Sequence, residues 1–191
     1  MDTQAFSLPA RPAPAIRIRP SRNEDLGAIT AIYGHHVRHG TASFELEPPG
    51  VEEMRRRRVE ILMRRLPYLV AEDADGAILG YAYAGAYRPR AAYGNTVENS
   101  IYARHDAVGR GIGTRLLAEL IARCEALGLR QMVAVVGDSA NLASVRLHQA
   151  LGFRVVGTLH AVGRKHGRWL DSVLLQRPLG RGEATAPLGE G

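Results

Sequence analysis

The stretch that decides the fold is VGRGIGTRLLAELIARCEALG, residues 108–128. Its three glycines, at 109, 111 and 113, precede a run whose apolar residues recur with helical spacing. Glycine lets the backbone approach a ligand closely, and the first N–H groups of a helix have no partner within it. The stretch therefore predicts a strand-to-helix turn that binds a phosphate group, with Thr114 and Arg115 as further donors. A tight turn without a ligand is the alternative that these residues leave open.

The spacing of the glycines excludes two familiar nucleotide motifs. A dinucleotide-binding turn has the pattern G-x-G-x-x-G, whereas this chain has G-x-G-x-G. The phosphate loop of ATP-binding proteins has a lysine directly after its last glycine, and here Gly113 is followed by Thr114. The turn therefore matches neither motif.

The composition indicates one folded domain. The chain has 191 residues, of which 46% are hydrophobic, which is enough for a substantial core. We expect residues 15–179 to fold, with residues 1–14 and 180–191 as flexible tails. No apolar run approaches the roughly 20 residues that span a membrane, and the N-terminus lacks the features of a signal peptide. A cytoplasmic protein without a membrane partner is therefore expected.

The chain is basic, with a net charge of +6 and a sequence pI of about 10.0. This charge permits an anionic partner such as nucleic acid, a membrane or a phosphorylated cofactor. Much of it lies in the arginine run 55–58, but Glu52 and Glu53 stand four residues before two of these arginines, the spacing of helical ion pairs. A solvated helix face is favoured over a nucleic-acid site, because no nucleic-acid motif accompanies the run.

Strand and helix patterns follow one another in a mixed order. Strands are expected at 15–20, 67–73, 77–88, 95–104 and 131–137, the last buried on both faces, and in FRVVGTLH and RWLDSVLLQ. Helices are expected at 21–37, with Ser21 and Glu24 as a capping box, at 51–65, after the glycines, and from Asn141. This order predicts an α/β protein of the α+β type, a single domain built on a mixed sheet.

Alternation along the strand expected at 95–104 divides its side chains between two faces. Val97, Asn99 and Ile101 are expected on one face, and Glu98 and Tyr102 on the other.

We expect no functional site at two further sets of reactive side chains, three histidines and the cysteine. His35, His36 and His39 form a cluster, but no carboxylate nearby completes a ligand set, so no metal is expected. Cys124, the only cysteine, falls in the apolar stripe of a helix. It is expected to be a packed thiol in a reducing compartment and not a nucleophile.

The ordered set of motifs resembles a known family. A strand, R-G-x-G-x-[ST] and a leucine-rich helix are similar to the acetyl-CoA motif of the Gcn5-related N-acetyltransferase (GNAT) superfamily, [QR]-x-x-G-x-[GA]. Gly111 and Gly113 match, whereas Val108 stands where glutamine or arginine is expected. The segments AYAGAYRPRAAYGNTVENSIYAR, MVAVVGDSANLASVRLHQALGF and AVGRKHGRWLDSVLLQRPL resemble the phosphinothricin and methionine sulfoximine N-acetyltransferases. The resemblance extends over nearly the whole folded part.

The resemblance implies a fold, an activity and an assembly. The fold is a single GNAT-like domain, in which about four helices flank a mixed, mostly antiparallel sheet. The activity is direct transfer of an acetyl group from acetyl-CoA to the α-amine of a small amino acid such as phosphinothricin, methionine sulfoximine or methionine sulfone. The enzyme would be cytosolic, commonly a homodimer, and would use no metal.

Two residues are the candidate catalytic groups. An α-ammonium cannot attack a thioester, so a base must remove its proton. Glu98, in V-E-N-S-I-Y, matches the family's catalytic glutamate, and partial burial is expected to raise its pKa. His148, in R-L-H-x-A-L-G-[FY], matches a residue beside the departing sulfur, with the direction of proton transfer left open.

The resemblance also implies how the cofactor is held. Main-chain groups of residues 101–103 would pair with the pantetheine arm like an extra strand. The glycine turn would hold the pyrophosphate, and Asn141 would cap its helix and contact the arm. The expected cofactor-binding residues are Ile101, Tyr102, Ala103, Gly109, Arg110, Gly111, Ile112, Gly113, Thr114, Asn141 and Ser144.

The expected amino-acid site uses two arginines and two aromatic residues. Arg88 and Arg90 can hold a carboxylate by paired hydrogen bonds, although a solvent-exposed charge is the alternative for either. Tyr93 and Phe44 are expected to wall the pocket, and Phe44, in T-A-S-F-E, matches the loop that covers the amino acid in the family. Lys165 and His166 match the family segment K-H-G without an assigned role.

Three other functions stay open at this point. One is acetylation of a protein N-terminus or a polyamine, and the two arginines weigh against a polyamine. The second is a basic nucleic-acid-binding module, which predicts strongly salt-dependent DNA binding. The third is an acetyl-CoA sensor that binds the cofactor without turnover.

Overall fold

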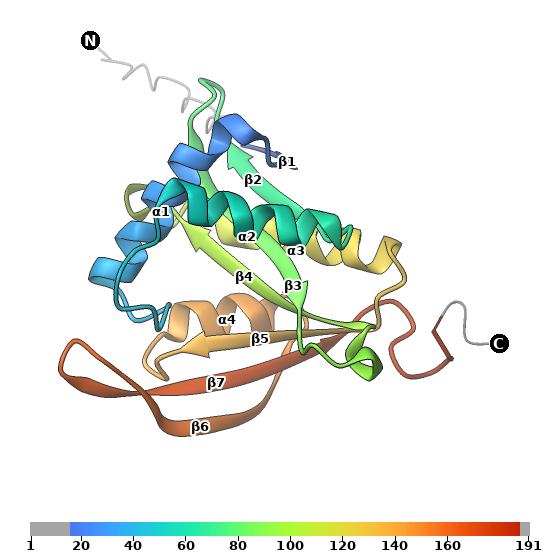
Figure 1. Cartoon of the computed structure of the whole chain (residues 1–191). Coiled ribbons are helices and arrows are strands. Elements are labelled where there is room, and N and C mark those ends of the chain that lie inside the picture. The colour runs from blue at the N-terminus through green and yellow to red at the C-terminus, as the bar shows by residue number, and fades with distance from the viewer. Residues whose placement is uncertain (1–15, 188–191) are drawn as a thin grey trace, which may run out of the picture.

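A seven-stranded sheet forms the centre of the molecule in the computed structural model, which describes residues 16–187 (Figure 1). The strand order is β1-β2-β3-β4-β5-β7-β6. All neighbouring strands are antiparallel except β4 and β5, which are parallel. This confirms the mixed sheet expected from the order of the elements and the mostly antiparallel pairing that the family resemblance implies.

The elements have the following bounds. The strands are β1 (Arg17–Pro20), β2 (Tyr68–Glu72), β3 (Ile78–Ala86), β4 (Thr96–Ala103), β5 (Gln131–Gly137), β6 (Arg154–Lys165) and β7 (Arg168–Pro178). The α-helices within residues 16–187 are α1 (Leu26–His39), α2 (Val51–Met63), α3 (Ile112–Ala126) and α4 (Leu142–Ala150). Short 3-10 helices occupy Asn23–Asp25, Ala91–Tyr93 and His105–Ala107.

The helices cover the two faces of the sheet in pairs (Figure 1). On one face, α1 and α2 bury Ile29 and Met54 against tyrosines of the sheet such as Tyr81. On the other face, α3 and α4 lie over a cluster that includes Leu116 and Leu120 of α3. The apolar stripe that follows the glycines is therefore the inner face of α3.

The one parallel pair, β4 and β5, separates before either strand ends. The two strands pair from Thr96 with Gln131 to Asn99 with Ala134, but β4 continues to Ala103 and β5 to Gly137. Residues 100–103 of β4 pair with β3 along one edge, and their other edge faces the gap. The gap also explains why the expectation that residues 131–137 are buried on both faces is wrong, since Val135 beside it is 40% exposed.

The first helix begins differently from the predicted capping box. Asp25, and not Glu24, accepts the reciprocal hydrogen bond, from the main-chain N–H of Arg22 at 2.6 Å. Ser21 is not the cap, because the buried Arg58 of α2 donates to its Oγ at 2.8 Å and to its carbonyl at 2.6 Å. The hydrogen bonds from Arg58 of α2 therefore occupy Ser21, which does not act as the helix cap that its sequence position predicts.

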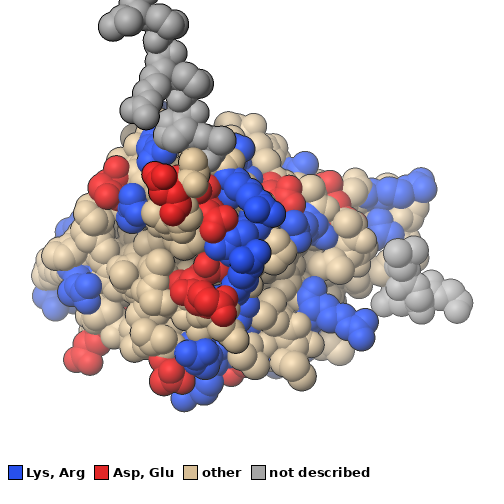
Figure 2. Space-filling view, turned by 90° about the horizontal axis from the view of Figure 1, so that it is seen from above, with Lys and Arg blue, Asp and Glu red and all other residues tan. Residues whose placement is uncertain are grey.

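Acidic side chains neutralise the arginine run of α2. Glu53 pairs with both Arg56 and Arg57, and Arg57 also pairs with Glu45. The pair Glu53–Arg57 was expected from its spacing, whereas the burial of Arg58 was not. Figure 2 shows basic and acidic side chains adjoining one another on the upper face of the molecule. These ion pairs weigh against a nucleic-acid site on this helix.

The two expected tails are described only in part. Residues 1–14 lie outside the described residues. Residues 180–187 form turns, and Arg130 donates to Thr185 Oγ1 at 2.9 Å and to the Ala186 carbonyl at 2.5 Å. None of the helices within residues 16–187 is long and apolar enough to cross a membrane.

Replacement of Leu120 by alanine tests how far α3 depends on its inner face. Leu120 is fully buried, so Leu120→Ala removes apolar contacts and leaves a cavity, and we expect a loss of about 2–5 kcal/mol in the free energy of unfolding. Leu127→Ala, at the exposed end of the same helix, is the matched control, with an expected change within about 0.5 kcal/mol. Urea denaturation measures both, and equal losses in the two variants would contradict this account.

Candidate active site

A cavity of about 830 Å³ lies where β4 and β5 separate. It gathers most of the predicted site residues from segments far apart in the sequence. The predicted residues that line it are Phe44, Glu98, Ile101, Tyr102, Ala103, Gly109, Gly111, Ile112, Gly113, Thr114, Asn141, Ser144 and His148. The predicted residues outside its lining are Arg88, Arg90, Tyr93 and Arg110.

Glycine is required at the three positions of the turn for different structural reasons. Gly109 and Gly111 adopt φ values of +78° and +72°, which residues other than glycine rarely adopt. The space beside both glycines is open. A side chain at Gly113 would lie 3.1 Å from Leu147 of α4, so this glycine lets α4 approach α3. The first two glycines therefore shape the turn, and the third packs two helices together.

The turn leaves the first main-chain donors of α3 available to a ligand. Gly111 is the N-cap of α3, and no side chain caps the helix there. The first N–H groups of a helix carry a partial positive charge and favour an anion. The open turn, the uncapped helix and the cavity beside them fit the pyrophosphate of a coenzyme A molecule.

The separated edge of β4 and the start of α4 border the same cavity. Residues 101–103 have no strand partner on the side of the gap, so an extended chain can pair with main-chain groups there. The Ala103 carbonyl is the exception, because it lies 2.7 Å from His36 Nε2. Asn141 caps α4, because its Oδ1 accepts a hydrogen bond from the Ser144 N–H at 3.3 Å, as its sequence position predicts.

The two candidate catalytic residues approach the gap from opposite faces of the sheet. The alternation predicted for this strand is confirmed, because Val97 packs in the cluster under α3 and Tyr102 in the cluster under α1 and α2. Glu98 therefore projects on the side of α1 and α2, and Asn99 on the side of α3 and α4, where it contacts His148. Both Glu98 and His148 line the cavity, so the cavity is reached from both faces of the sheet.

The environment of Glu98 favours the protonated form of its carboxyl group. Its side chain is half-buried on β4, and this burial raises the pKa of its carboxyl group above the ordinary value of 4.5. The positive charge of Arg88 acts in the opposite direction and lowers the pKa of Glu98. A carboxylate with a raised pKa accepts a proton more readily than an exposed one.

His148 is buried, with 4% of its surface exposed. Its Nδ1 lies 2.7 Å from the Ser144 carbonyl, and its Nε2 lies 3.0 Å from Oδ1 of Asn99. The ring also meets Phe153 edge-on, with the ring centroids 5.1 Å apart. Burial lowers the pKa of His148, and the hydrogen bond with Ser144 opposes that shift. Asn99 was not a predicted site residue, although the alternation of β4 already placed it on this face.

The loop that contains Phe44 forms a wall of the cavity and is held by α1 and α2. The hydroxyl group of Tyr33 lies 2.9 Å from Ser43 Oγ and donates to Glu45 at 2.8 Å. Glu45 also accepts from Arg57 at 2.6 Å. Burial is the main reason that the pKa of Tyr33 rises to about 12, so its hydroxyl group keeps its proton.

The other side of this loop is held by β6 and β5. Lys165, 4% exposed, donates from Nζ to the Ser43 carbonyl at 2.7 Å, which gives this residue of the K-H-G segment a structural role. A side chain at Gly163 would lie 2.5 Å from the Phe44 ring, and one at Gly137 would lie 2.6 Å from the Thr41 carbonyl. No local sequence pattern indicates that these glycines and this lysine meet the loop.

The remaining predicted substrate residues lie apart from the main cavity. Arg88 lines a second cavity of about 340 Å³ at the end of β3, and its guanidinium group lies 4.9 Å from the centre of the Tyr87 ring. It is still close enough to Glu98 to affect the pKa of that carboxyl group. Arg90 is exposed, and Tyr93 meets Tyr87 edge-on at 5.7 Å.

The histidine cluster and the cysteine have ordinary structural contacts. His36 Nε2 lies 2.7 Å from the Ala103 carbonyl, and the His35 ring stacks on His105 at 4.0 Å. Within residues 16–187, no three side chains of the metal-binding types form a group that could hold an ion. Cys124 is fully buried, and burial raises the pKa of its thiol to about 12.

Comparisons with known proteins agree with this architecture. The acetyltransferase (GNAT) domain family matches residues 18–174. The chain is 57% identical over 173 residues to a phosphinothricin N-acetyltransferase of Alcaligenes faecalis, with 91% of this chain and 87% of that protein covered. It is 42% identical over 159 residues to an L-methionine sulfoximine/L-methionine sulfone acetyltransferase of Pseudomonas aeruginosa, with 83% and 92% covered.

A solved structure extends the agreement to the cofactor. A GNAT superfamily phosphinothricin acetyltransferase from Sinorhizobium meliloti, determined in complex with acetyl-CoA, matches this structure with a TM-score of 0.89 and 48% identity. The match covers 92% of this chain and 94% of that one. The domain match and these relatives confirm the resemblance carried by the glycine turn and its neighbouring motifs. The chain belongs to the GNAT family and is an acetyl-CoA-dependent N-acetyltransferase.

Proposed function

We propose that this enzyme acetylates the α-amine of a small amino acid of the phosphinothricin, methionine sulfoximine or methionine sulfone type. The observation that carries the proposal is the cavity at the β4–β5 gap, with Glu98 on one side of the sheet and the glycine turn on the other. The cofactor can enter from the side of α3 and α4, and the amine from the side of α1 and α2. The names of two relatives, which specify phosphinothricin and methionine sulfoximine or sulfone, support the substrate class.

The cofactor is held by main-chain groups in this proposal. The N–H groups of the glycine turn, from Gly109 to Thr114, bind the pyrophosphate, with Arg110 beside them. The free edge at residues 101–103 pairs with the pantetheine arm, which Asn141 and Ser144 contact from α4. Bound acetyl-CoA supplies the thioester whose acetyl group is transferred.

The amino acid occupies the side of the cavity under the Phe44 loop. Glu98 takes a proton from the α-ammonium, directly or through a water molecule, and so frees the amine to attack. Arg88 offers a cation for the carboxylate of the substrate, at a distance from which it already affects the pKa of Glu98. Arg90 and Tyr93 stay predicted substrate contacts, although both lie outside the lining of the cavity.

Transfer is direct, within a complex of both substrates. A covalent acetyl-enzyme would need a reactive nucleophile, and Cys124 is fully buried with a pKa of about 12. The single cysteine is consistent with a reducing compartment, and we place the enzyme in the cytoplasm. Acetylation removes the positive charge of the α-amine. The product therefore lacks the ammonium group by which a protein recognises an amino acid, and this loss suits a role in detoxification.

Thiol release from acetyl-CoA across a panel of amines tests the proposed function. We expect the largest kcat/KM with phosphinothricin, methionine sulfoximine or methionine sulfone, because the site combines a base with a cation for the substrate carboxylate. Spermidine and a peptide with a free N-terminus are the comparison amines, and a reaction without an amine is the control.

Each alternative function has its own outcome in this experiment. Release with only the polyamine or only the peptide would overturn the substrate class. Normal acetyl-CoA binding without release on any amine would indicate a sensor. Strongly salt-dependent DNA binding that does not require Glu98 would indicate a nucleic-acid-binding module.

Glu98→Gln tests the assignment of the base. The amide cannot accept the proton, so we expect kcat to fall by about 10²–10⁴-fold while the Kd of acetyl-CoA is unchanged. In the unaltered enzyme, kcat/KM should rise with pH through an apparent pKa above 4.5, because the raised pKa of Glu98 must be passed before the base is free. This acidic limb should be absent from the variant.

The matched control is Glu24→Gln, which changes an exposed carboxylate just before α1 that lines neither cavity. Its kcat and its pH profile should equal those of the unaltered enzyme. Undiminished turnover in Glu98→Gln would remove Glu98 from the mechanism.

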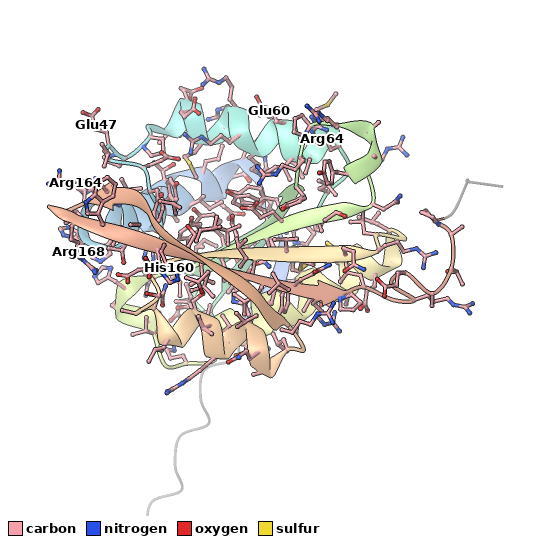
Figure 3. The ribbon with its side chains drawn as sticks, turned by 90° about the horizontal axis from the view of Figure 1, so that it is seen from below. Glu47, Glu60, Arg64, His160, Arg164 and Arg168 are labelled. Carbon is pink, nitrogen blue, oxygen red and sulfur yellow. The ribbon has the colours of Figure 1, made fainter. Side chains whose placement is uncertain are left out.

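We further propose that two copies of the chain associate through the hairpin of β6 and β7. This hairpin forms the outer edge of the sheet, and the free edge of β6 pairs with no other described strand (Figures 1 and 3). It exposes several large apolar side chains, namely Val155, Val156, Leu159, Val162 and Trp169. A long open strand with apolar residues requires a cover, and a second copy provides a matching surface.

Sedimentation of a charged variant tests this association. We expect the unaltered chain to sediment as a dimer and Val156→Glu/Trp169→Glu as a monomer, because two charges would be buried at the interface. Met63→Glu, at an exposed apolar residue of α2, should remain a dimer. A monomeric unaltered chain would contradict the proposal.

A further inference from the structure

A continuous chain of hydrogen bonds joins β5 to α4 at the point where β4 and β5 separate. It begins at the Val133 carbonyl of β5, to which Asn99 Nδ2 donates at 3.2 Å. It continues from Asn99 Oδ1 to His148 Nε2 at 3.0 Å, and from His148 Nδ1 to the Ser144 carbonyl at 2.7 Å. Asn99 and His148 are both buried, with 6% and 4% of their surfaces exposed, so water is a poor substitute for these partners.

The partners at the two ends determine where the protons lie. A carbonyl oxygen only accepts, so the Ser144 carbonyl requires a proton on Nδ1 of His148. The Val133 carbonyl likewise requires the amide nitrogen of Asn99, which directs the amide oxygen toward Nε2. That oxygen also only accepts, so Nε2 must carry a proton too. All three hydrogen bonds coexist only when the His148 ring is a doubly protonated imidazolium.

The neutral ring cannot keep the same arrangement. With its proton on Nδ1, its Nε2 presents a lone pair to the oxygen of Asn99, and two acceptors face each other. A half-turn of the Asn99 amide would allow Nδ2 to donate to Nε2. It would also place the amide oxygen against the Val133 carbonyl, where the present contact measures 3.2 Å. One buried hydrogen bond is therefore lost whenever the ring loses its proton.

We propose that Asn99 is a positioning residue that controls the protonation of His148, because its amide satisfies Val133 and His148 together only when the ring is protonated. Burial of the ring acts in the opposite direction and favours the neutral form. As an acceptor that faces Nε2, the Asn99 oxygen favours the protonated ring and so offsets part of that effect.

No charged side chain competes with Asn99 for the ring. The ring of His148 is within hydrogen-bond distance of the Ser144 carbonyl of its own helix and the Asn99 amide of β4, and it meets the Phe153 ring after α4 edge-on. Among residues 16–187, no acidic or basic side chain forms an ion pair with His148. Glu98 follows the opposite face of β4, and its carboxyl group is not hydrogen-bonded to the ring.

The consequence for the reaction rests on the proposed function. When the bond between the acetyl carbon and the sulfur breaks, the sulfur leaves with the electron pair and needs a proton. The Nε2 proton of His148 leaves its hydrogen bond with Asn99 and moves to that sulfur, which gives the free thiol and a neutral ring. The Asn99 amide then turns to donate to the neutral ring. The amine nitrogen loses two protons in the reaction, which pass to Glu98 and on to the solvent. One proton taken back from the solvent restores the imidazolium before the next turnover, so one proton is released overall.

An NMR titration of the full chain tests the role of Asn99 without any reaction. The chain has 7 histidines, so ¹⁵N-labelled histidine is used and His148→Gln identifies the signal of His148. Asn99→Asp provides an acceptor with a negative charge, and we expect it to raise the pKa of His148 by about one unit or more. Asn99→Leu has a similar shape but no acceptor, and we expect it to lower the pKa by about one unit. Ser100→Ala, on the opposite face of β4, is the control and should leave the pKa unchanged.

The opposite directions separate this role from a merely structural one. A loss of packing would shift the pKa of His148 the same way in both variants. Shifts in the same direction, or no shift in either variant, would overturn the proposal. Circular dichroism verifies folding, and if Asn99→Leu does not fold, Asn99→Ser replaces it with the same expected direction, because its hydroxyl group is too short to reach the ring.

The kinetic readout distinguishes this inference from the proposed function. The alkaline limb of the kcat profile should move to higher pH in Asn99→Asp and to lower pH in Asn99→Leu. If no amine is acetylated but the two NMR shifts appear, the proposed function fails and the role of Asn99 stands. If amino acids are acetylated but the shifts are absent, the role of Asn99 fails and the proposed function stands.

Discussion

The separation of β4 from β5 is the constraint on which the rest of the site depends. A parallel pair that stayed together would satisfy every main-chain group and leave no space between the strands. Here the pairing ends at Asn99 and Ala134, so the edge of β4 at residues 100–103 lacks its partner on one side. The cavity, the free main-chain groups and the access from both faces of the sheet all follow from this single interruption.

The interruption also divides the chemistry between two environments. Residues that alternate along β4 reach opposite faces, so Glu98 is placed among the tyrosines under α1 and α2, and Asn99 beside α4. A carboxylate and an imidazolium in contact would each hold the other in its charged form, which would lower the pKa of the base and raise that of the proton donor. Placed on opposite faces, Glu98 and His148 can have pKa values that different surroundings set in opposite directions.

Local patterns predicted the parts of this structure that depend on neighbouring residues. The glycine turn, the stripe of α3, the alternation of β4 and the cap at Asn141 each follow from spacing alone. Ser21 was misassigned because Arg58, a residue of another helix, takes its hydroxyl group. Asn99 was missed for a similar reason, since its partners Val133 and His148 come from β5 and α4. Contacts between distant segments leave no trace in a single sequence.

The Phe44 loop connects the gap between β4 and β5 to the edge of the sheet. Strand β6 makes room for the Phe44 ring at Gly163 and holds the Ser43 carbonyl with Lys165, two residues further along. Burial lowers the pKa of Lys165, and the negative charge of Glu45 in the same loop opposes that shift. The loop therefore supplies the charge that helps keep its own anchor protonated. Since β6 is also the outermost strand, a contact that orders the hairpin orders the wall of the cavity.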